Sequence, residues 1–186
     1  MTYYGPKEMA AAFRTVRNNT IKIAEEIPEE KYGFRATPET RSVAETLVHI
    51  AVTPRVPTQI HFTEHRHTLV GFDFFGVMGA LMAEAAKPRS KAEILELLRT
   101  EGENFAKLLE GASESFVAEQ VTYPEGMMPP VKSRFEMLIS AKEHEMHHRA
   151  QLMVIERMIG QKPHLTRQME ERIAAMQSAA GAASKA

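Results

Sequence analysis

Apolar side chains recur every three or four residues along most of the chain, which is the spacing of amphipathic α-helices. The first stripe is formed by Met9, Phe13, Val16, Thr20 and Ile23. It predicts a helix over residues 6–26, and Pro6 suits the first turn of that helix because its fixed φ angle is helical.

Three further stripes predict long helices, and a weaker pattern predicts a fifth helix. Ser42 and Ser90 are suited to cap two of the long helices, because a serine hydroxyl can accept a hydrogen bond from a free backbone amide. Glu45 stands at the capping-box position of the first of these, and Pro54 ends or bends it. The predicted spans are residues 42–53, 90–111, 133–159 and 166–176.

The middle of the chain is less regular. It predicts a short helix over residues 57–67, a loop over 71–79 and another short helix over 80–87. Strand signals are few, since no segment alternates steadily between apolar and polar residues. We therefore expect an all-α four-helix bundle with extra short helices. We expect one domain over residues 1–178, followed by a disordered tail over 179–186.

Composition narrows the range of partners. Of the 186 residues, 44% are hydrophobic and 25% charged, and the formal net charge is −1. No block of basic residues favours nucleic acid as a partner. We expect neither a signal peptide nor a membrane span, and hence a cytoplasmic protein. Cysteine is absent, so any metal ion has to be held by His, Asp or Glu.

The segment "HEMHH", residues 144–148, carries the most specific chemistry. His144 and His148 are four residues apart, so on a helix they share one face. That face continues the apolar stripe of Ala141, Leu152 and Ile155. Two imidazoles in such a stripe need hydrogen-bond partners or a metal ion, because unpaired buried polar groups are costly. The spacing alone does not decide between hydrogen-bonded core histidines and a metal site.

The same five residues match the zinc-peptidase signature H-E-x-x-H, in which Glu145 would be the general base. The extended form of the signature fails, because Gln151 and Val154 stand where its glycine and third histidine belong. Glu145 and His147 each lie about 100° around the helix from a neighbouring histidine of the pair. We therefore expect Glu145 to be solvated and His147 not to bind metal.

Other histidines could supply a third ligand. His49 lies at the edge of an apolar helix face, and Glu45 one turn earlier is suited either to orient it or to cap the helix. A second cluster, His61, His65 and His67, lies in the irregular middle segment. Its members could be metal ligands, part of a pocket wall or part of a surface patch.

Two segments together resemble the DinB-like family of metal-binding four-helix bundles. They are "KYGFRATPETRSVAETLVHIA" and, some ninety residues later, "HEMHHRAQLMVIERMIG". The resemblance implies a three-histidine metal site made of His49, His144 and His148. Such a ligand set suits a divalent ion, zinc or nickel first and iron or manganese next.

The resemblance also implies a range of functions. The chain could be a metal-dependent hydrolase or a thiol-dependent S-transferase in stress response or detoxification, with a small-molecule substrate and a low-molecular-weight thiol. The alternatives are a non-catalytic metal- or small-molecule-binding bundle, a bundle with a vestigial site, and a zinc metallopeptidase. The apolar segment "FDFFGVMGALM", residues 72–82, predicts a homodimer, because it is too apolar for a free surface loop.

Overall fold

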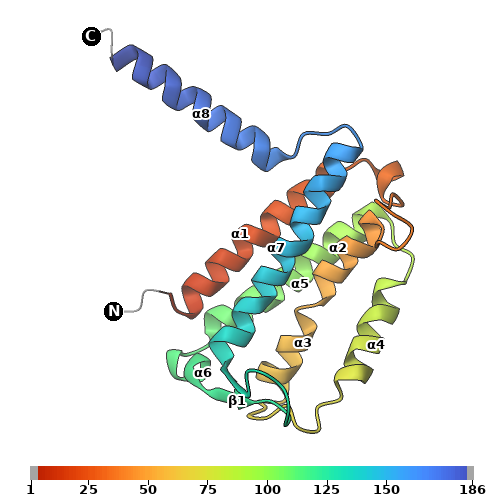
Figure 1. The fold of residues 1–186 in the computed structure, drawn as a ribbon, viewed down its shortest axis with the longest axis vertical. Helices are drawn as coiled ribbons and strands as arrows, with labels where there is room; N and C mark the ends of the chain where they lie inside the picture. The colour runs from red at the N-terminus through yellow and green to blue at the C-terminus, as the bar shows by residue number, and fades with distance from the viewer. Residues whose placement is uncertain (1–3, 184–186) are drawn as a thin grey trace.

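The computed structural model describes residues 4–183. Four helices form the bundle (Figure 1): α1 (Pro6–Glu26), α2 (Val43–Val52), α5 (Lys91–Gly111) and α7 (Arg134–Met158). Helix α2 is extended by α3 (Arg55–Pro57) and by the π-helix η2 (Thr58–Thr63), and the short η1 (Glu29–Lys31) follows α1. The predicted all-α bundle is confirmed, with each of its four long helices near the expected position.

Three bundle helices begin at the same type of capping box. In each, the serine Oγ accepts a hydrogen bond from the backbone amide three residues later, and the glutamate at that position accepts one from the serine amide. The pairs are Ser42 with Glu45, Ser90 with Glu93, and Ser133 with Glu136. Glu45 is therefore a capping residue, and its other partner is Arg35 rather than His49.

The middle of the chain differs from the expectation. A helix, α4 (Phe74–Ala85), occupies most of the predicted loop 71–79 and extends through the segment where a separate short helix was expected. Its start is fixed by Asp73, whose Oδ1 accepts a hydrogen bond of 2.9 Å from the Gly76 amide. The two glycines and the aromatic run of this segment are typical of a loop. The cap and the packing against the bundle outweigh their low helix propensity.

The proline-rich connector before α7 also contains structure that was not predicted. A short helix, α6 (Glu114–Ala118), leads into an antiparallel pair of strands, β1 (Gln120–Thr122) and β2 (Val131–Ser133). Each strand is only three residues long, which is too short to show a sequence alternation. The hairpin closes one end of the bundle next to α7 (Figure 1).

The interior of the bundle holds a buried ion pair. Arg17 of α1 and Glu145 of α7 are 3% and 1% exposed, and Arg17 Nε donates to both carboxylate oxygens at 3.0 and 3.1 Å. The same guanidinium donates to the carbonyls of Leu98 on α5 and Ile50 on α2. Arg17 thus contacts all four bundle helices. The expectation that Glu145 is solvated was wrong.

A close approach of α1 and α5 makes room for this guanidinium. A Cβ atom at Gly102 would lie 2.7 Å from Arg17 Cγ, so an alanine at this position would collide with the arginine. The apolar core extends on either side of the pair: Leu47, Leu98 and Leu152 belong to one cluster of buried residues, and Phe13, Phe105 and Leu138 belong to the other.

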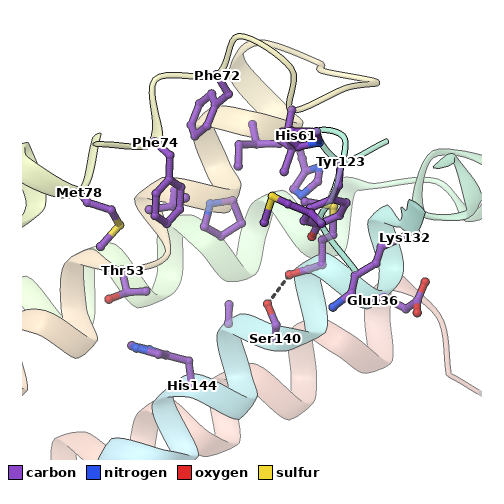
Figure 2. Close-up of a pocket in the computed structure, with 18 of the residues that line it drawn as sticks. Thr53, His61, Phe72, Phe74, Met78, Tyr123, Lys132, Glu136, Ser140 and His144 are labelled. Atoms are coloured by element: carbon purple, nitrogen blue, oxygen red, sulfur yellow. Dashed lines mark hydrogen bonds between the residues drawn. The ribbon is translucent and has the colours of Figure 1, made fainter. Parts of the chain in front are cut away.

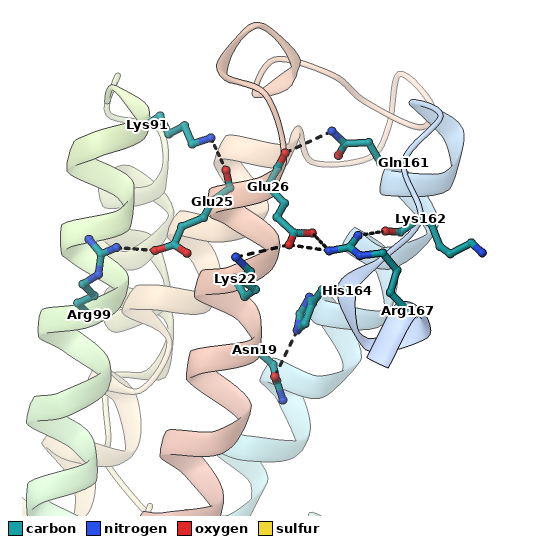
Figure 3. Close-up of polar contacts among 10 residues, drawn as sticks. All are labelled: Asn19, Lys22, Glu25, Glu26, Lys91, Arg99, Gln161, Lys162, His164 and Arg167. Atoms are coloured by element: carbon teal, nitrogen blue, oxygen red, sulfur yellow. Dashed lines mark hydrogen bonds and ion pairs between the residues drawn. The ribbon is translucent and has the colours of Figure 1, made fainter. Parts of the chain in front are cut away.

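The last helix, α8 (His164–Ala183), projects away from the bundle (Figure 1). Its base is held by Arg167, which donates to both oxygens of Glu26, and by His164, which pairs with Asn19 at 3.3 Å (Figure 3). The helix is longer than the predicted 166–176 and includes 179–183 of the tail that was expected to be disordered. The rest of that tail, 184–186, lies outside the described residues.

Glu156, near the C-terminus of α7, is fully buried, and among the described residues neither of its carboxylate oxygens has a hydrogen-bond partner. Burial, and secondarily the charge of Glu26, raises its pKa from 4.5 to about 7. Because the folded chain then holds this proton more tightly than the unfolded chain, ionisation favours unfolding. The contribution of this group to stability is therefore fully present below pH 4.5 and is lost as the pH rises through about 7.

We therefore expect Glu156→Gln to change the pH dependence of stability. Relative to the variant, the parent protein should lose on the order of 2 kcal/mol of unfolding free energy between pH 4.5 and pH 8. Urea unfolding at both values measures this difference. Glu171→Gln, on the exposed part of α8, is the matched control. A constant difference between parent and Glu156→Gln at the two pH values would contradict the assignment.

Among residues 4–183, no helix is both long enough and apolar enough to cross a membrane.

Candidate metal centre

Three histidines from two helices meet inside the bundle. His49 of α2 and His144 of α7 bring their Nε2 atoms to 3.1 Å, and the Nε2 atoms of His144 and His148 are also 3.1 Å apart. All three candidate ligand atoms lie within 4.8 Å of one another. The structure thus brings together the three residues that the sequence analysis selected, two by their spacing and His49 by resemblance.

Hydrogen bonding fixes one of the three rings. His148 Nδ1 lies 2.8 Å from Oε1 of Gln151, one turn along α7. With the amide oxygen as acceptor, Nδ1 carries the proton and Nε2 presents a lone pair to the cluster. Gln151 therefore fixes the orientation of the His148 ring, as the hydrogen-bond partners of metal-binding histidines commonly do. The sequence analysis missed this role, although the i, i+3 spacing from His148 could have suggested it.

Burial keeps the three rings neutral. The pKa of His49 is lowered to about 3 and that of His144 to about 4, chiefly by burial and to a lesser extent by Arg41 and the neighbouring histidines. The pKa of His148 is also lowered, chiefly by burial, against a weaker opposing effect of Gln151. Neutral imidazole is the form that binds metal ions, so the site favours ligation at neutral pH.

The donor set fits a divalent ion. One proton on His144 Nε2 cannot satisfy both of its 3.1 Å neighbours, whereas a single metal ion accepts all three lone pairs. In tetrahedral zinc sites, Zn–N bonds of about 2.0–2.1 Å place the nitrogen atoms about 3.3 Å apart. Two of the three spacings, at 3.1 Å each, are close to that value, and the third lies within 4.8 Å, so the three histidines could converge on one metal ion.

The other residues of the H-E-x-x-H match face elsewhere. Glu145 is committed to Arg17, and His147 is exposed with its Nε2 3.2 Å from Gln151. A peptidase would need Glu145 free beside the metal-bound water. The arrangement therefore does not supply the general base of a zinc metallopeptidase.

The second histidine cluster does not form a ligand set. His61 is fully buried and pairs through Nδ1 with Arg134 at 3.0 Å, whereas His65 and His67 are exposed. Within residues 4–183, these three do not form a group with metal-ligand spacing. The position of His61 agrees with the hypothesis that it forms part of a pocket wall. The positions of the other two agree with the hypothesis of a surface patch.

A cavity of about 700 Å³ adjoins the histidine cluster. His49 and His144 both line it, and Figure 2 shows His144 on one side and His61, Tyr123 and Lys132 on the other. Most of the remaining wall is apolar and comes from α3, η2, α4 and the hairpin region, including Val56, Ile60, Phe72, Phe74, Met78 and Met127. The sequence analysis could not assemble this pocket, because its walls come from segments far apart in the chain.

Comparison with known proteins places the chain in a family. The sequence profile of the DinB superfamily matches residues 12–152, which include His49, His144 and His148. The chain belongs to the DinB superfamily. Among curated proteins, none matches the sequence significantly.

Solved DinB-like structures share the fold. A DinB-like protein from Bacillus subtilis is 19% identical, with 83% of this chain and 94% of that one covered and a TM-score of 0.61. YfiT from Bacillus subtilis, described as a probable metal-dependent hydrolase with an unusual four-helix bundle topology, is 13% identical, with coverage of 87% and 91% and a TM-score of 0.66.

A third structural match is to a larger protein. The mycothiol-dependent maleylpyruvate isomerase is 11% identical, and the match covers 82% of this chain and 63% of that one, with a TM-score of 0.60. At these identities the likeness of all three structures concerns the fold of the bundle.

Proposed function

We propose that this DinB-superfamily protein is a metal-dependent enzyme that acts on a small molecule. The metal site would consist of His49, His144 and His148. It would hold one divalent ion, and zinc and nickel are favoured over iron and manganese. The observation that carries the proposal is the cavity beside His49 and His144. A three-histidine site keeps at least one position open, and here that position has room for a substrate.

A bound ion of this kind would act as a Lewis acid that lowers the pKa of a water molecule or a thiol. The chain's own residues orient the site. Gln151 holds the His148 ring, the bundle helices fix the spacing of the three Nε2 atoms, and burial keeps the rings neutral. The apolar walls limit water around the reacting groups.

Transfer of a low-molecular-weight thiol to an electrophile is the reaction that the pocket supports best. Glu136 is the carboxylate that lines it, and that carboxylate accepts two hydrogen bonds of 2.8 Å from Ser133 as part of the α7 cap. Thiol activation needs only the metal, because a thiol ionises near neutral pH, whereas hydrolysis also benefits from a free acid or base. Hydrolysis remains the second candidate, supported by the description of YfiT.

The test is turnover with defined metal content. Protein purified without a nickel column is stripped, loaded with zinc or nickel, and assayed with glutathione and 1-chloro-2,4-dinitrobenzene, and separately with p-nitrophenyl esters. We expect thiol conjugation that requires the metal and disappears in His144→Ala. Ester cleavage without thiol would favour the hydrolase instead. Metal binding without turnover across broad panels would favour a non-catalytic binding bundle.

The apolar face of α4 supports the predicted homodimer, which stays a prediction. Phe75 is 89% exposed, Phe74 52% and Met82 67%, an unusual cluster for a free surface. We expect a dimer at micromolar concentration in sedimentation velocity and a shift toward monomer in Phe75→Ser. Val154→Ser, which replaces an exposed apolar residue on α7, should leave the dimer intact. A parent protein that sediments only as monomer would rule the dimer out.

A further inference from the structure

The polar groups around the cavity are nearly all hydrogen-bond donors. The hydroxyls of Ser140 and Thr53 already donate to the backbone carbonyls of Met137 and His49. The side chains left to engage a ligand at the end away from the histidine cluster are those of Lys132, Tyr123 and His61. An ammonium group and a phenol both donate hydrogen bonds, and the protonation of His61 can be derived from its partner.

Lys132 carries the uncommitted charge of the pocket. Within the described part of the chain, no ion pair or hydrogen bond of its ammonium group is found, although Glu136 also lines the cavity. The Glu136 carboxylate is held by Ser133 at the start of α7. A ligand that enters therefore meets an ammonium group with no hydrogen-bonded counterion among the described residues, whereas the Glu136 carboxylate is engaged by Ser133.

His61 adds a hydrogen-bond donor, and its contact with Arg134 determines which ring nitrogen carries the proton. Its Nδ1 contacts Arg134, and a guanidinium can only donate, so Nδ1 accepts and the proton of the neutral ring lies on Nε2. Among the described residues that Nε2–H has no partner, although the side chain is fully buried in the pocket wall. A buried donor without an acceptor costs about 1–3 kcal/mol, so an acceptor oxygen here would be stabilising.

The space between the two polar ends is lined by hydrocarbon. Aromatic rings from the start of α4, branched side chains from α3 and η2, and methionines line this space. Met78, Met127 and Met137 also line the cavity, and their flexible side chains can adapt to the shape of a ligand. Such a lining favours a molecule with an apolar body and one polar end.

We propose that the cavity binds an apolar monocarboxylate, with its carboxylate at Lys132 and its hydrocarbon body extending toward His144. Tyr123 and His61 donate to the carboxylate oxygens beside the ammonium group. The role of this monocarboxylate as the substrate of a metal-dependent reaction rests on the proposed function. The binding itself needs no metal, because the anion-binding end lies across the cavity from His144 (Figure 2).

The test is calorimetric binding of two matched probes, 4-phenylbutanoate and 4-phenylbutan-1-ol, to the full chain with zinc and after chelation. We expect the carboxylate to bind about tenfold more tightly than the alcohol in both conditions, as for a charged hydrogen bond. Lys132→Met should remove that preference and leave alcohol binding unchanged, whereas Lys132→Arg should keep it. Lys132 lies on the partly exposed strand β2, so both variants should fold.

Each other outcome has a defined meaning. Equal binding of the two probes, or no binding of either, would overturn the proposal. A preference that survives in Lys132→Met but disappears on chelation would overturn it too, because the carboxylate would then bind the metal. If the metal-free protein shows the Lys132-dependent preference while the zinc-loaded protein has no turnover, the proposed function fails and this inference stands.

Discussion

Alanine at His144 is expected to nearly abolish metal binding. His144 Nε2 lies 3.1 Å from the Nε2 atoms of both His49 and His148, so its removal leaves two nitrogens with no shared neighbour. The affinity for zinc should fall by more than the roughly 10- to 100-fold that loss of an outer-shell partner costs. His49→Ala and His148→Ala should behave similarly.

Calorimetry with zinc measures the affinities, and thermal unfolding gives a second readout. A ligand present at 100 times its dissociation constant stabilises the folded state by about 2.7 kcal/mol, and this metal-dependent gain should shrink in all three variants. Gln151→Ala should weaken binding less, because it removes only the partner of His148 Nδ1.

Two matched controls test the assignment. His147→Ala and His65→Ala change exposed histidines outside the cluster and should retain the metal. If His49→Ala binds zinc as well as the parent while His65→Ala does not, the three-histidine assignment is wrong.

The second large effect concerns the buried ion pair of Arg17 and Glu145. Truncating Glu145 to alanine leaves the guanidinium charge buried and uncompensated, which typically costs about 3–5 kcal/mol of stability. Glu145→Ala should therefore unfold at much lower urea concentration than the parent, yet still bind zinc while folded. The hypothesis of a zinc metallopeptidase predicts the reverse, namely that the variant keeps its stability and loses a proteolytic activity.

A double substitution separates charge burial from packing. Arg17→Met with Glu145→Met removes both charges and keeps apolar volume, so it should recover much of the stability lost in Arg17→Met alone or Glu145→Met alone. Gly102→Ala is an independent probe, because its methyl group would collide with Arg17 and should destabilise the parent more than the double variant. Additive losses in the double variant would contradict a coupled pair.

The sequence predicted the bundle because long helices display their periodicity over many turns. It also identified His144 and His148, since four-residue spacing within one helix is a local property. His49 came only from family resemblance, because no local pattern tells which of eight histidines will meet a given pair. The ligand set therefore depended on knowledge beyond helix periodicity.

Features that depend on distant contacts were not predictable in the same way. Arg17 and Glu145 are 128 positions apart, and each stands on a helix where a charged residue is normally solvated. The role of His61 depends on Arg134, 73 positions away, which fixes its tautomer. Helix α4 was mistaken for a loop because Gly76 and Gly79 dominate its local signal, whereas its cap depends on Asp73.

The projecting helix α8 has a practical consequence. It leaves the bundle at the end opposite to the β1 hairpin and α3 (Figure 1), and both of these segments contribute residues to the cavity wall. The chain contains no cysteine, so Ser178→Cys on the exposed part of α8 would create a unique attachment point for maleimide chemistry. Protein immobilised there would keep the cavity facing solution, and α8 would act as a spacer from the sensor surface.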